Sequence, residues 1–430
     1  MSLLIENAKI ITVNALSEVI DKGFVLISDG KIEQVGSGVF EGEVLQRVDA
    51  KGCALLPGWV NTHTHSAMSI YRGLADDIAL KDWLEKHIWP AEAAFGNASN
   101  VRVGGRLAMM EMIASGTTTF NDMYFFQTAM AEEVDSFGMR AVLGEGILDF
   151  PTPFIKNPNQ ALEIIESEVR NWSGSDLIGF AITPHAPYTV SKERIIGAKK
   201  LSEKLGIGLH THLSETAFEV AQCQELHGVS PVKYLDDLGV LDSSVVAAHC
   251  VHVSEQDMEI IAKKGMSVAH NPHSNMKLGS GIAPISGMLS KDITVGVGTD
   301  GAASNNNLNM YLELSSASKM AKAFHQDPTV LPALKMLEMG TIDGARMLGL
   351  EDKIGSIEVG KRADIQIVEL DRQEVLPIYD IISHLIFAMN GSQVRDVMVD
   401  GKFIYRNRVF KTINKEKVFE EVRALAAQIR

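Results

Sequence analysis

The segment PGWVNTHTH, residues 57–65, sets two histidines one residue apart, directly after an apolar run and a Pro-Gly turn. Side chains of a β-strand alternate between its two faces, so His63 and His65 point to one side and Thr64 to the other. Two imidazoles on one face can share a metal ion, but they can also be ordinary hydrogen-bonded residues. The pair alone does not decide between these readings, and the rest of the chain has to.

Short apolar runs alternate with amphipathic segments from residue 57 to about residue 345. Eight of the runs are typical of strands, and nearly all are followed by a segment with helical periodicity. The eight runs are ALLPGWVNTHTH (54–65), TTTFND (117–122), RAVLGEGIL (140–148), LIGFAIT (177–183), GIGLHTH (206–212), VVAAHC (245–250), MSVAHN (266–271) and TVGVGTD (294–300). This alternation predicts an α/β fold, a (β/α)8 barrel of the TIM type, with catalytic groups at the C-terminal ends of the strands.

Polar side chains stand at the ends of these predicted strands. They are His63 and His65, Asn121 and Asp122, His212, His249, His270 and Asp300. A barrel brings all such positions to one face of the molecule. A doubly wound open sheet is the structural alternative, but it rarely places histidines at the ends of so many strands.

Both ends of the chain predict strands outside the barrel. Residues 1–56 show the period-two alternation and turn residues of hairpins, and strand character returns after about residue 350. The last segment, residues 414–430, has the pattern of an amphipathic helix. We therefore expect a barrel over residues 57–349, flanked by one small β-sandwich. Residues 1–56 and 350–430 would form that sandwich, with the terminal helix in its C-terminal part.

Composition excludes several kinds of partner. The formal net charge is −14 and no run of basic residues occurs, which argues against nucleic acid and anionic membranes. The first ten residues lack a signal-peptide core, and no apolar stretch approaches the ~18 residues of a membrane span. The three cysteines, Cys53, Cys223 and Cys250, form no CxxC pair and fit buried residues of a reducing cytoplasm. Exposed barrel helices are compatible with a homo-oligomer.

A metal site is the first chemical prediction. If the barrel is right, His63, His65, His212 and Asp300 converge from strands 1, 5 and 8. Three neutral imidazoles and one carboxylate suit zinc or Fe(II) and leave room for water. Such an ion lowers the pKa of a bound water to about 7. Considered alone, His212 is more often structural, but four residues at barrel-compatible positions reverse that balance.

Two further residues are candidates for proton transfer. Glu215 follows His212 by three residues, where a carboxylic acid can carry protons between water and substrate. An acidic residue in the first turn of a helix is the other reading of Glu215. His249, at the end of the sixth predicted strand, can hydrogen-bond the water and hold its charge.

A missing lysine favours a single metal ion. Barrel hydrolases with two metals commonly bridge them with a modified lysine on the fourth strand. That strand reads LIGFAIT here and contains no lysine. We therefore expect one divalent ion per subunit, with zinc preferred over Fe(II).

Six motifs occur in an order that resembles the amidohydrolase superfamily, in particular the methylthioadenosine/S-adenosylhomocysteine deaminases of its aminohydrolase branch. They are PGWVNTHTH, TPHAPYTVS, HTHLSET, AAHCVH, HNPHSNMKLGSGIAP and GTDGAASNNNLNMY. The segment GSIEVGKRADI is similar to the family's returning sandwich strand, so the resemblance covers nearly the whole chain. Triazine chlorohydrolases and guanine or pterin deaminases share much of this pattern.

The resemblance implies roles for individual residues. The zinc ligands would be His63, His65, His212 and Asp300, in agreement with the reading from strand ends. Glu215 would protonate the purine ring at N1, while His249 and Asp300 would orient and deprotonate the attacking water. Glu92 would bind the ribose hydroxyls and His185 would contact the nucleoside. Without the resemblance, Glu92 reads equally well as a solvated helix residue, and His185 as a residue that orients its loop.

The third predicted strand departs from the family. Several members carry an arginine at its end and a second one in the following loop, which meet the amino-acid end of S-adenosylhomocysteine. Glu145 stands near the first position here, and the loop NPNQALE has no arginine. An acidic residue repels a substrate carboxylate in a partly desolvated pocket. We therefore expect methylthioadenosine to be preferred over S-adenosylhomocysteine.

The sequence thus predicts a zinc-dependent deaminase of an adenine nucleoside that releases ammonia and the inosine analogue. Adenosine and 5′-deoxyadenosine are further possible substrates. A triazine chlorohydrolase or a guanine or pterin deaminase on the same site is the alternative within the enzymes. A metal-free scaffold protein is the remote alternative, because every expected ligand position is filled.

Overall fold

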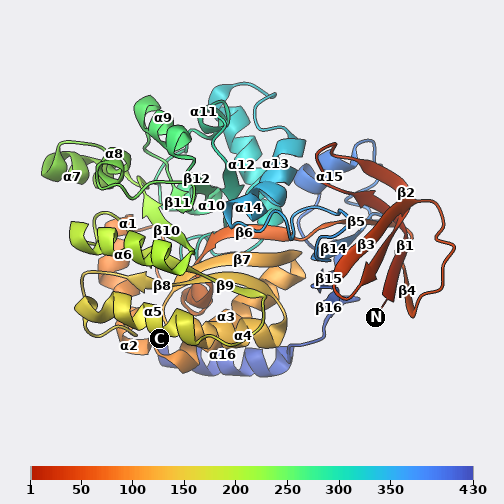
Figure 1. Cartoon of the computed structure of the whole chain (residues 1–430), viewed down its shortest axis with the longest axis horizontal. Helices are drawn as coiled ribbons and strands as arrows, with labels where there is room; N and C mark the ends of the chain where they lie inside the picture. Colours follow the sequence, from red (N-terminus) through yellow and green to blue (C-terminus); the bar gives the residue numbers. More distant parts are fainter. Residues whose placement is uncertain (1, 430) are drawn as a thin grey trace.

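The computed structural model describes residues 2–429, and its larger part is a nearly closed barrel (Figure 1). Eight parallel strands lie in the order β13-β12-β11-β10-β9-β8-β7-β6. The two end strands contact each other, and the backbone N–H of Asp300 donates to the carbonyl of His63 across this seam at 3.0 Å. The strands are β6 (Trp59–Thr64), β7 (Thr117–Tyr124), β8 (Arg140–Ile147), β9 (Ile178–Pro184), β10 (Gly208–Leu213), β11 (Val245–His249), β12 (Ser267–His270) and β13 (Val295–Val297). The predicted barrel is confirmed.

Helices follow the barrel strands and cover the barrel from outside (Figure 1). Their bounds are α1 (Leu80–Trp83), α2 (Trp89–Phe95), α3 (Ala98–Ala114), α4 (Gln127–Phe137), α5 (Ala161–Asn171), α6 (Lys192–Leu205), α7 (Ala217–His227), α8 (Pro231–Asp237), α9 (Glu255–Lys264), α10 (Pro272–Lys277), α11 (Ile285–Leu289), α12 (Met310–His325), α13 (Ala333–Met339), α14 (Ile342–Met347), α15 (Ile381–Phe387) and α16 (Lys415–Ile429). Three short helical turns are η1 (Ser66–Tyr71), η2 (Leu84–Ile88) and η3 (Pro158–Gln160).

Helix α9 illustrates how local sequence sets these bounds. Ser254 caps its N-terminus by accepting from the N–H of Asp257, and the Asp257 carboxylate accepts from the N–H of Ser254 in return. This reciprocal capping box satisfies two backbone donors that the helix itself leaves free. Gly265 follows the last residue with φ +69°, a conformation that glycine adopts without a steric penalty.

Strands from both ends of the chain form one small mixed sheet beside the barrel (Figure 1). Its order is β17-β16-β15-β14-β5-β1-β2-β3, and β4 pairs with β1. The strands are β1 (Ser2–Ile11), β2 (Val19–Ser28), β3 (Lys31–Ser37), β4 (Gln46–Asp49), β5 (Cys53–Pro57), β14 (Ile365–Glu369), β15 (Val394–Val399), β16 (Lys402–Arg406) and β17 (Val409–Phe410). The antiparallel pair of β5 and β14 joins the two ends, with Leu55 opposite Ile367. Both ends of the chain therefore contribute to one small β unit, as predicted. Its strands form a single continuous sheet.

One predicted strand is divided in the structure. The run ALLPGWVNTHTH contributes its first part to β5 of the small sheet and its second part to β6 of the barrel. Gly58 lies between them, where a Cβ atom would stand 2.1 Å from the side chain of Thr118. Both halves are buried, so the apolar pattern runs on without a break and hides the division.

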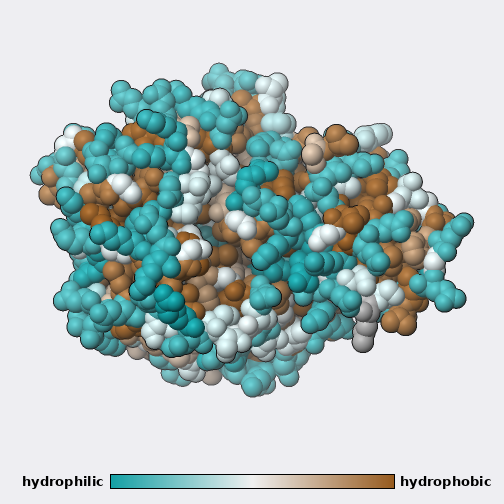
Figure 2. Space-filling view, viewed as in Figure 1, coloured by the Kyte–Doolittle hydropathy of each residue, from teal (hydrophilic) through white to brown (hydrophobic). Residues whose placement is uncertain are grey.

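The C-terminal helix α16 packs on the barrel, because it lies against α3 and Arg106 of α3 pairs with Glu421 at 2.9 Å (Figure 1). The division of the chain at residues 56/57 and 349/350 stays a prediction. Hydrophilic residues cover most of the face seen in Figure 2, and hydrophobic residues appear there in separate groups. Within residues 2–429, no helix has the length and apolar character needed to cross a membrane.

Candidate active site

Three imidazoles and one carboxylate meet at the C-terminal ends of the barrel strands. His63 and His65 come from the end of β6, His212 from β10, and Asp300 from the segment after β13. Nε2 of His65 lies 3.2 Å from Nε2 of His212 and 3.2 Å from Oδ1 of Asp300. Nε2 of His63 lies 3.4 Å from the same carboxylate oxygen. The structure thus brings together the four residues that the sequence predicts as ligands.

The opposite nitrogen of each imidazole is held by the protein. Nδ1 of His65 donates to the carbonyl of Met123, and Nδ1 of His212 donates to the carbonyl of His185 at 2.7 Å. Nδ1 of His63 lies 2.9 Å from Nε2 of His210. Such contacts fix ring orientation and tautomer, so that each Nε2 presents its lone pair to the common centre.

Three hydrogen-bond donors orient the carboxylate of Asp300. Its Oδ2 accepts from the hydroxyls of Ser274 (2.5 Å) and Ser304 (2.9 Å), and its Oδ1 accepts from the N–H of Gly301 (2.7 Å). Although burial opposes ionisation, His63 and His65 hold the pKa of Asp300 well below its ordinary value. The carboxylate is therefore charged at neutral pH and is suited to a cation.

The donor set fits a single divalent ion. Nε2 of His63 is buried and has no hydrogen-bond partner among residues 2–429, which is costly unless a ligand satisfies it. His63, His65 and His212 offer nitrogens within 4.8 Å of one another, and so do His63, His249 and Asp300 with their ligand atoms. Burial lowers the pKa of His63 to about 4 and that of His212 well below its ordinary value. Although burial acts in the same direction on His65, Asp300 raises the pKa of His65 to about 9, so a metal ion would replace a proton on this ring. Imidazoles in their neutral form, together with a carboxylate, are typical zinc ligands.

Glu215 and His249 lie next to this centre. Glu215 stands in the turn between β10 and α7, and its Oε2 is 3.8 Å from Nε2 of His249. His249, which ends β11, donates from Nδ1 to the side-chain oxygen of Asn275 at 2.8 Å. Burial raises the pKa of Glu215, which favours its protonated form. The pair can therefore hold a proton close to a water at the centre.

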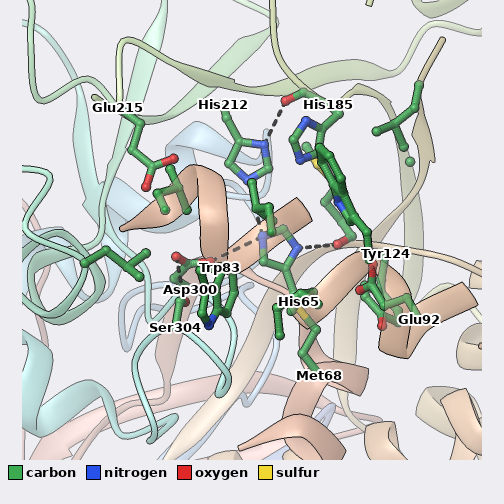
Figure 3. A pocket seen from close by; sticks show the side chains of 18 of the residues that line it. His65, Met68, Trp83, Glu92, Tyr124, His185, His212, Glu215, Asp300 and Ser304 are labelled. Atoms are coloured by element: carbon green, nitrogen blue, oxygen red, sulfur yellow. Dashed lines mark hydrogen bonds and ion pairs between the residues drawn. The ribbon is translucent and has the colours of Figure 1, made fainter. Parts of the chain in front are cut away.

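Glu92 and His185 form other parts of the same cavity wall (Figure 3). Figure 3 shows Glu92 beside Tyr124, on the opposite side of the imidazoles from Glu215. Glu92 is 5% exposed, and burial raises its pKa to about 7. His185 lies beside His212, with ring centroids 4.7 Å apart, and its Nδ1 lies 2.9 Å from the hydroxyl of Thr189. The reading of Glu92 as a solvated helix residue is wrong, because its side chain is buried in the cavity wall.

The expectation for Glu145 is also wrong. Its carboxylate accepts from the N–H of Gln127 at the start of α4, at 3.0 Å, and is absent from the cavity lining. Gly146 and Leu148 are the residues of this segment that line the cavity. Both faces of β8 are buried, so hydrophobicity gave no sign of which face looks into the barrel. Glu145 therefore supplies no repulsion to a substrate.

His210 is a member of the site that the sequence reasoning missed. It contacts His63 through Nε2, and the side-chain amide of Asn121 lies 3.1 Å from its Nδ1. The signal was present, because His210 and His212 repeat the spacing of His63 and His65 on a strand. Aromatic side chains of the wall, such as Trp83 and Trp89, were missed as well and carry no motif that could have identified them.

Comparison with known proteins identifies the family to which this chain belongs. The model of the amidohydrolase family matches residues 54–404. The chain belongs to the amidohydrolase family. It is 42% identical to a 5-methylthioadenosine/S-adenosylhomocysteine deaminase of Thermodesulfovibrio yellowstonii, over 98% of this chain and 97% of the relative. It is 41% identical to a 5′-deoxyadenosine deaminase of Methanosarcina mazei, over 99% of this chain and 98% of the relative.

A solved structure is similar over the whole chain. It is the crystal structure of an adenosine deaminase from Xanthomonas campestris with bound zinc, at 36% identity and a TM-score of 0.97. The match covers 100% of this chain and 98% of that one. Membership of the amidohydrolase family agrees with a metal-dependent aminohydrolase, and the zinc of this neighbour agrees with the donor set described above.

Proposed function

We propose that this amidohydrolase is a zinc-dependent deaminase of adenine nucleosides, with 5′-methylthioadenosine as its preferred substrate. The products are ammonia and the inosine analogue. The observation that carries the proposal is the meeting of three Nε2 atoms and one carboxylate oxygen beside a buried, protonatable Glu215. Relatives named as deaminases of such nucleosides, about 41% identical over nearly the full chain, support it.

The ligands in this proposal are His63, His65, His212 and Asp300. A divalent ion held by them would supply a water activated for attack at neutral pH. Hydrolysis adds the oxygen of one water to C6 of the adenine ring and releases the amino group as ammonia. His249 and Asp300 would orient that water and accept its proton, since each has a ligand atom within 4.8 Å of a ring nitrogen of His63.

Glu215 is the proton donor to N1 of the purine. A carboxyl group must be protonated for this task, and burial raises the pKa of Glu215 in that direction. Protonation of N1 draws electrons from C6 and makes it a better target for the water. The proton first taken from the water by His249 or Asp300 then goes, directly or through Glu215, to the leaving amine, which departs as ammonia. N1 keeps the proton from Glu215, and Glu215 is reprotonated by the proton of the new C6 hydroxyl as the carbonyl forms.

Glu92 and His185 bind the nucleoside in this proposal. Glu92 accepts from the ribose hydroxyls, while Glu215, which lines the same cavity on the other side of the imidazoles, meets the purine ring (Figure 3). His185 contacts the nucleoside from the turn after β9. Burial lowers its pKa to about 3, so it acts as a neutral hydrogen-bonding group.

The preference for methylthioadenosine follows from the rest of the wall. Leu84, Trp89, Leu148 and Tyr188 line the cavity, and no lysine or arginine within residues 2–429 is among its lining residues. A methylthio group loses little on leaving water for such a wall, whereas a carboxylate without a cationic partner is costly to bury. The preference therefore depends on the absence of a cationic side chain from the described residues of this wall and not on Glu145.

A panel of substrates tests the proposal. Purified protein with one zinc per subunit is assayed for ammonia with methylthioadenosine, 5′-deoxyadenosine, adenosine, S-adenosylhomocysteine and guanine, and for chloride with a chlorotriazine. We expect the highest kcat/KM with methylthioadenosine. Ammonia from guanine alone, or chloride release without ammonia, would replace the proposed activity by one of the alternatives. No turnover of any compound by the zinc-loaded protein would favour a scaffold.

We also propose that the protein acts in the cytoplasm on a small molecule, without nucleic acid; its barrel helices are compatible with a homo-oligomer. Its three cysteines are buried and unpaired, which suits a reducing compartment. The net charge of −14 opposes binding to polyanions. Light scattering of the purified protein decides its oligomeric state, and a mass of 46.9 kDa would mean a monomer.

A further inference from the structure

The turn that carries Glu215 has an unusual backbone. Strand β10 ends at Leu213 and α7 begins at Ala217, so only three residues join them. Ser214 has φ +51°, the left-handed region that non-glycine residues rarely adopt. Ser214 and Glu215 are almost completely buried, so water cannot satisfy their backbone N–H groups.

Glu219 satisfies both of these donors. Its Oε1 accepts from the N–H of Ser214 and its Oε2 from the N–H of Glu215, each at 2.8 Å. Successive N–H groups that point into one concavity form a site for an anion, and here a carboxylate of the same chain fills it. Glu219 is 3% exposed, and burial raises its pKa to about 7. Each of its two oxygens accepts its hydrogen bond in a desolvated place, where water does not compete.

The sequence pattern around Glu219 predicts a different contact. Thr216 caps α7 and accepts from the N–H of Glu219 at 3.2 Å, which is one half of a capping box. In the complete box the acidic side chain returns to the N–H of the capping residue, as Asp257 does with Ser254 in α9. In α7 the carboxylate reaches further back, to Ser214 and Glu215. The carboxylate of Glu219 therefore holds Glu215, which lies beside the proposed metal centre, and does not cap the helix.

The side chain of Glu215 has little else to hold it. Among residues 2–429, its carboxyl group accepts one hydrogen bond, from the hydroxyl of Ser280 to Oε1 at a long 3.4 Å. The position of its carboxyl group, 3.8 Å from His249, therefore depends on where the backbone of the turn places its Cα atom.

We propose that Glu219 is a positioning residue for Glu215: it clamps the backbone of residues 214 and 215 and so sets the place of the proton donor. The inference rests on the proposed function, because it concerns the same proton transfer. A misplacement of about 1 Å at a reacting group costs about 100-fold in rate. The clamp thus acts on turnover and leaves the ligands of the metal untouched.

The substitution Glu219→Gln tests the clamp. Glutamine keeps the size but offers a single acceptor oxygen, and its NH2 group then faces one of the two N–H donors. We expect kcat for methylthioadenosine to fall about 10- to 100-fold, with KM and zinc content nearly unchanged. Glu225→Gln, at an exposed position of the same helix, should keep wild-type kcat. Thr216→Ala, which removes the cap but leaves the clamp, should lower Tm and keep kcat within about twofold.

A double-mutant cycle separates positioning from general damage. If Glu219 acts through Glu215, the variant with both Glu215→Gln and Glu219→Gln has the same kcat as Glu215→Gln alone. Multiplied losses, loss of zinc in Glu219→Gln, or an unchanged kcat would each overturn the proposal. If Glu219→Gln does not fold, Glu219→Asp enters the same cycle, since it keeps the charge but withdraws it by one methylene. An inactive wild-type enzyme would instead refute the proposed function.

Discussion

The chemistry of the site depends on how the protein holds both nitrogens of each imidazole. Where Nδ1 donates to a backbone carbonyl, as in His65 and His212, Nε2 is left as a free lone pair. His63 contacts another histidine instead, and this contact continues to Asn121 through His210. The position of polar side chains at the ends of apolar runs indicated the proposed ligands in the sequence. It could not identify Nδ1 partners that are backbone atoms of distant residues.

The substitution Glu215→Gln should remove most of the activity and keep the metal. Glutamine has nearly the same shape but cannot give a proton to N1, so we expect kcat to fall at least 100-fold. Zinc per subunit should stay at one, because Glu215 is not a ligand in the proposed set. Ammonia release and metal analysis on the same preparation check this, with Glu225→Gln as the matched control. Near-wild-type turnover would take the proton-transfer role away from Glu215.

Glu92 should make stability depend on pH. Burial raises its pKa from an ordinary 4.5 to about 7. A raised pKa means that the folded protein binds the proton more tightly than the unfolded chain. The stability that Glu92 contributes is therefore full below about pH 4.5 and is lost as the pH rises to about 7.

Glu92→Gln should escape this loss, because glutamine stays neutral. We expect the variant's free energy of unfolding, relative to wild type, to increase by about 3 kcal/mol from pH 4.5 to pH 8, at 1.36 kcal/mol per pKa unit. Denaturant unfolding of the zinc-loaded proteins at several pH values measures it. A difference that stays constant over this range would show that the Glu92 carboxyl titrates normally. The KM for the nucleoside should rise in the same variant.

The barrel strands show what periodicity can and cannot predict. All eight were found, since each is a short apolar run followed by a helix. His212, His249 and His270 stand at or next to the ends of their strands as predicted, whereas β7 continues past Asn121 and Asp122 to Tyr124. The face that a side chain occupies was predictable only where a polar residue marked it. In β8, buried on both sides, no such mark existed and Glu145 was assigned to the wrong face. The boundary at Gly58 was hidden for the same reason.

The seam between β13 and β6 has no room for an extra atom at Gly298. A Cβ there would lie 2.5 Å from Oδ1 of Asn271 and 2.8 Å from backbone atoms of His63. The added methyl group of Gly298→Ala must therefore push β6, with His63 and His65, away from the segment that carries Asp300. We expect a loss of about 1–3 kcal/mol of stability and a lower zinc content.

Gly179→Ala is the matched control on another barrel strand. Its nearest atom would be Cγ2 of Val142 at 3.6 Å, an ordinary contact. We expect its Tm to stay the same or rise slightly, since alanine loses less conformational freedom than glycine on folding. Equal effects of the two substitutions on Tm and zinc content would mean that the seam tolerates an added methyl group.

A buried ion pair connects the barrel with the small sheet. Arg140 begins β8, and its guanidinium donates to both oxygens of Asp364, at 2.8 and 3.2 Å, just before β14. The two side chains are 5% and 1% exposed. Such a contact between segments far apart in sequence cannot be predicted from composition or periodicity, although the two units themselves were predicted.

Arg140→Met should be strongly destabilising. It leaves Asp364 buried without its cation, a change that costs about 3–5 kcal/mol. Arg170→Met is the control, because Arg170 pairs with Glu166 on the surface, where its side chain is 52% exposed, and such pairs contribute about 0–1 kcal/mol. Urea unfolding of both variants gives the two values. Similar small losses would mean that the barrel and the sheet do not depend on this contact.

The pairing of β5 with β14 has a consequence for how the protein is made. Pro57 lies opposite Ile365, so β5 leaves the ribosome roughly 300 residues before its neighbour. Because synthesis adds about 5–20 residues per second, this edge of the sheet stays unpaired for on the order of 15–60 s. An unpaired apolar strand edge invites pairing with other chains. Every newly made copy must therefore pass through a partly folded, aggregation-prone state. A chaperone that shields nascent chains should raise the yield of active enzyme.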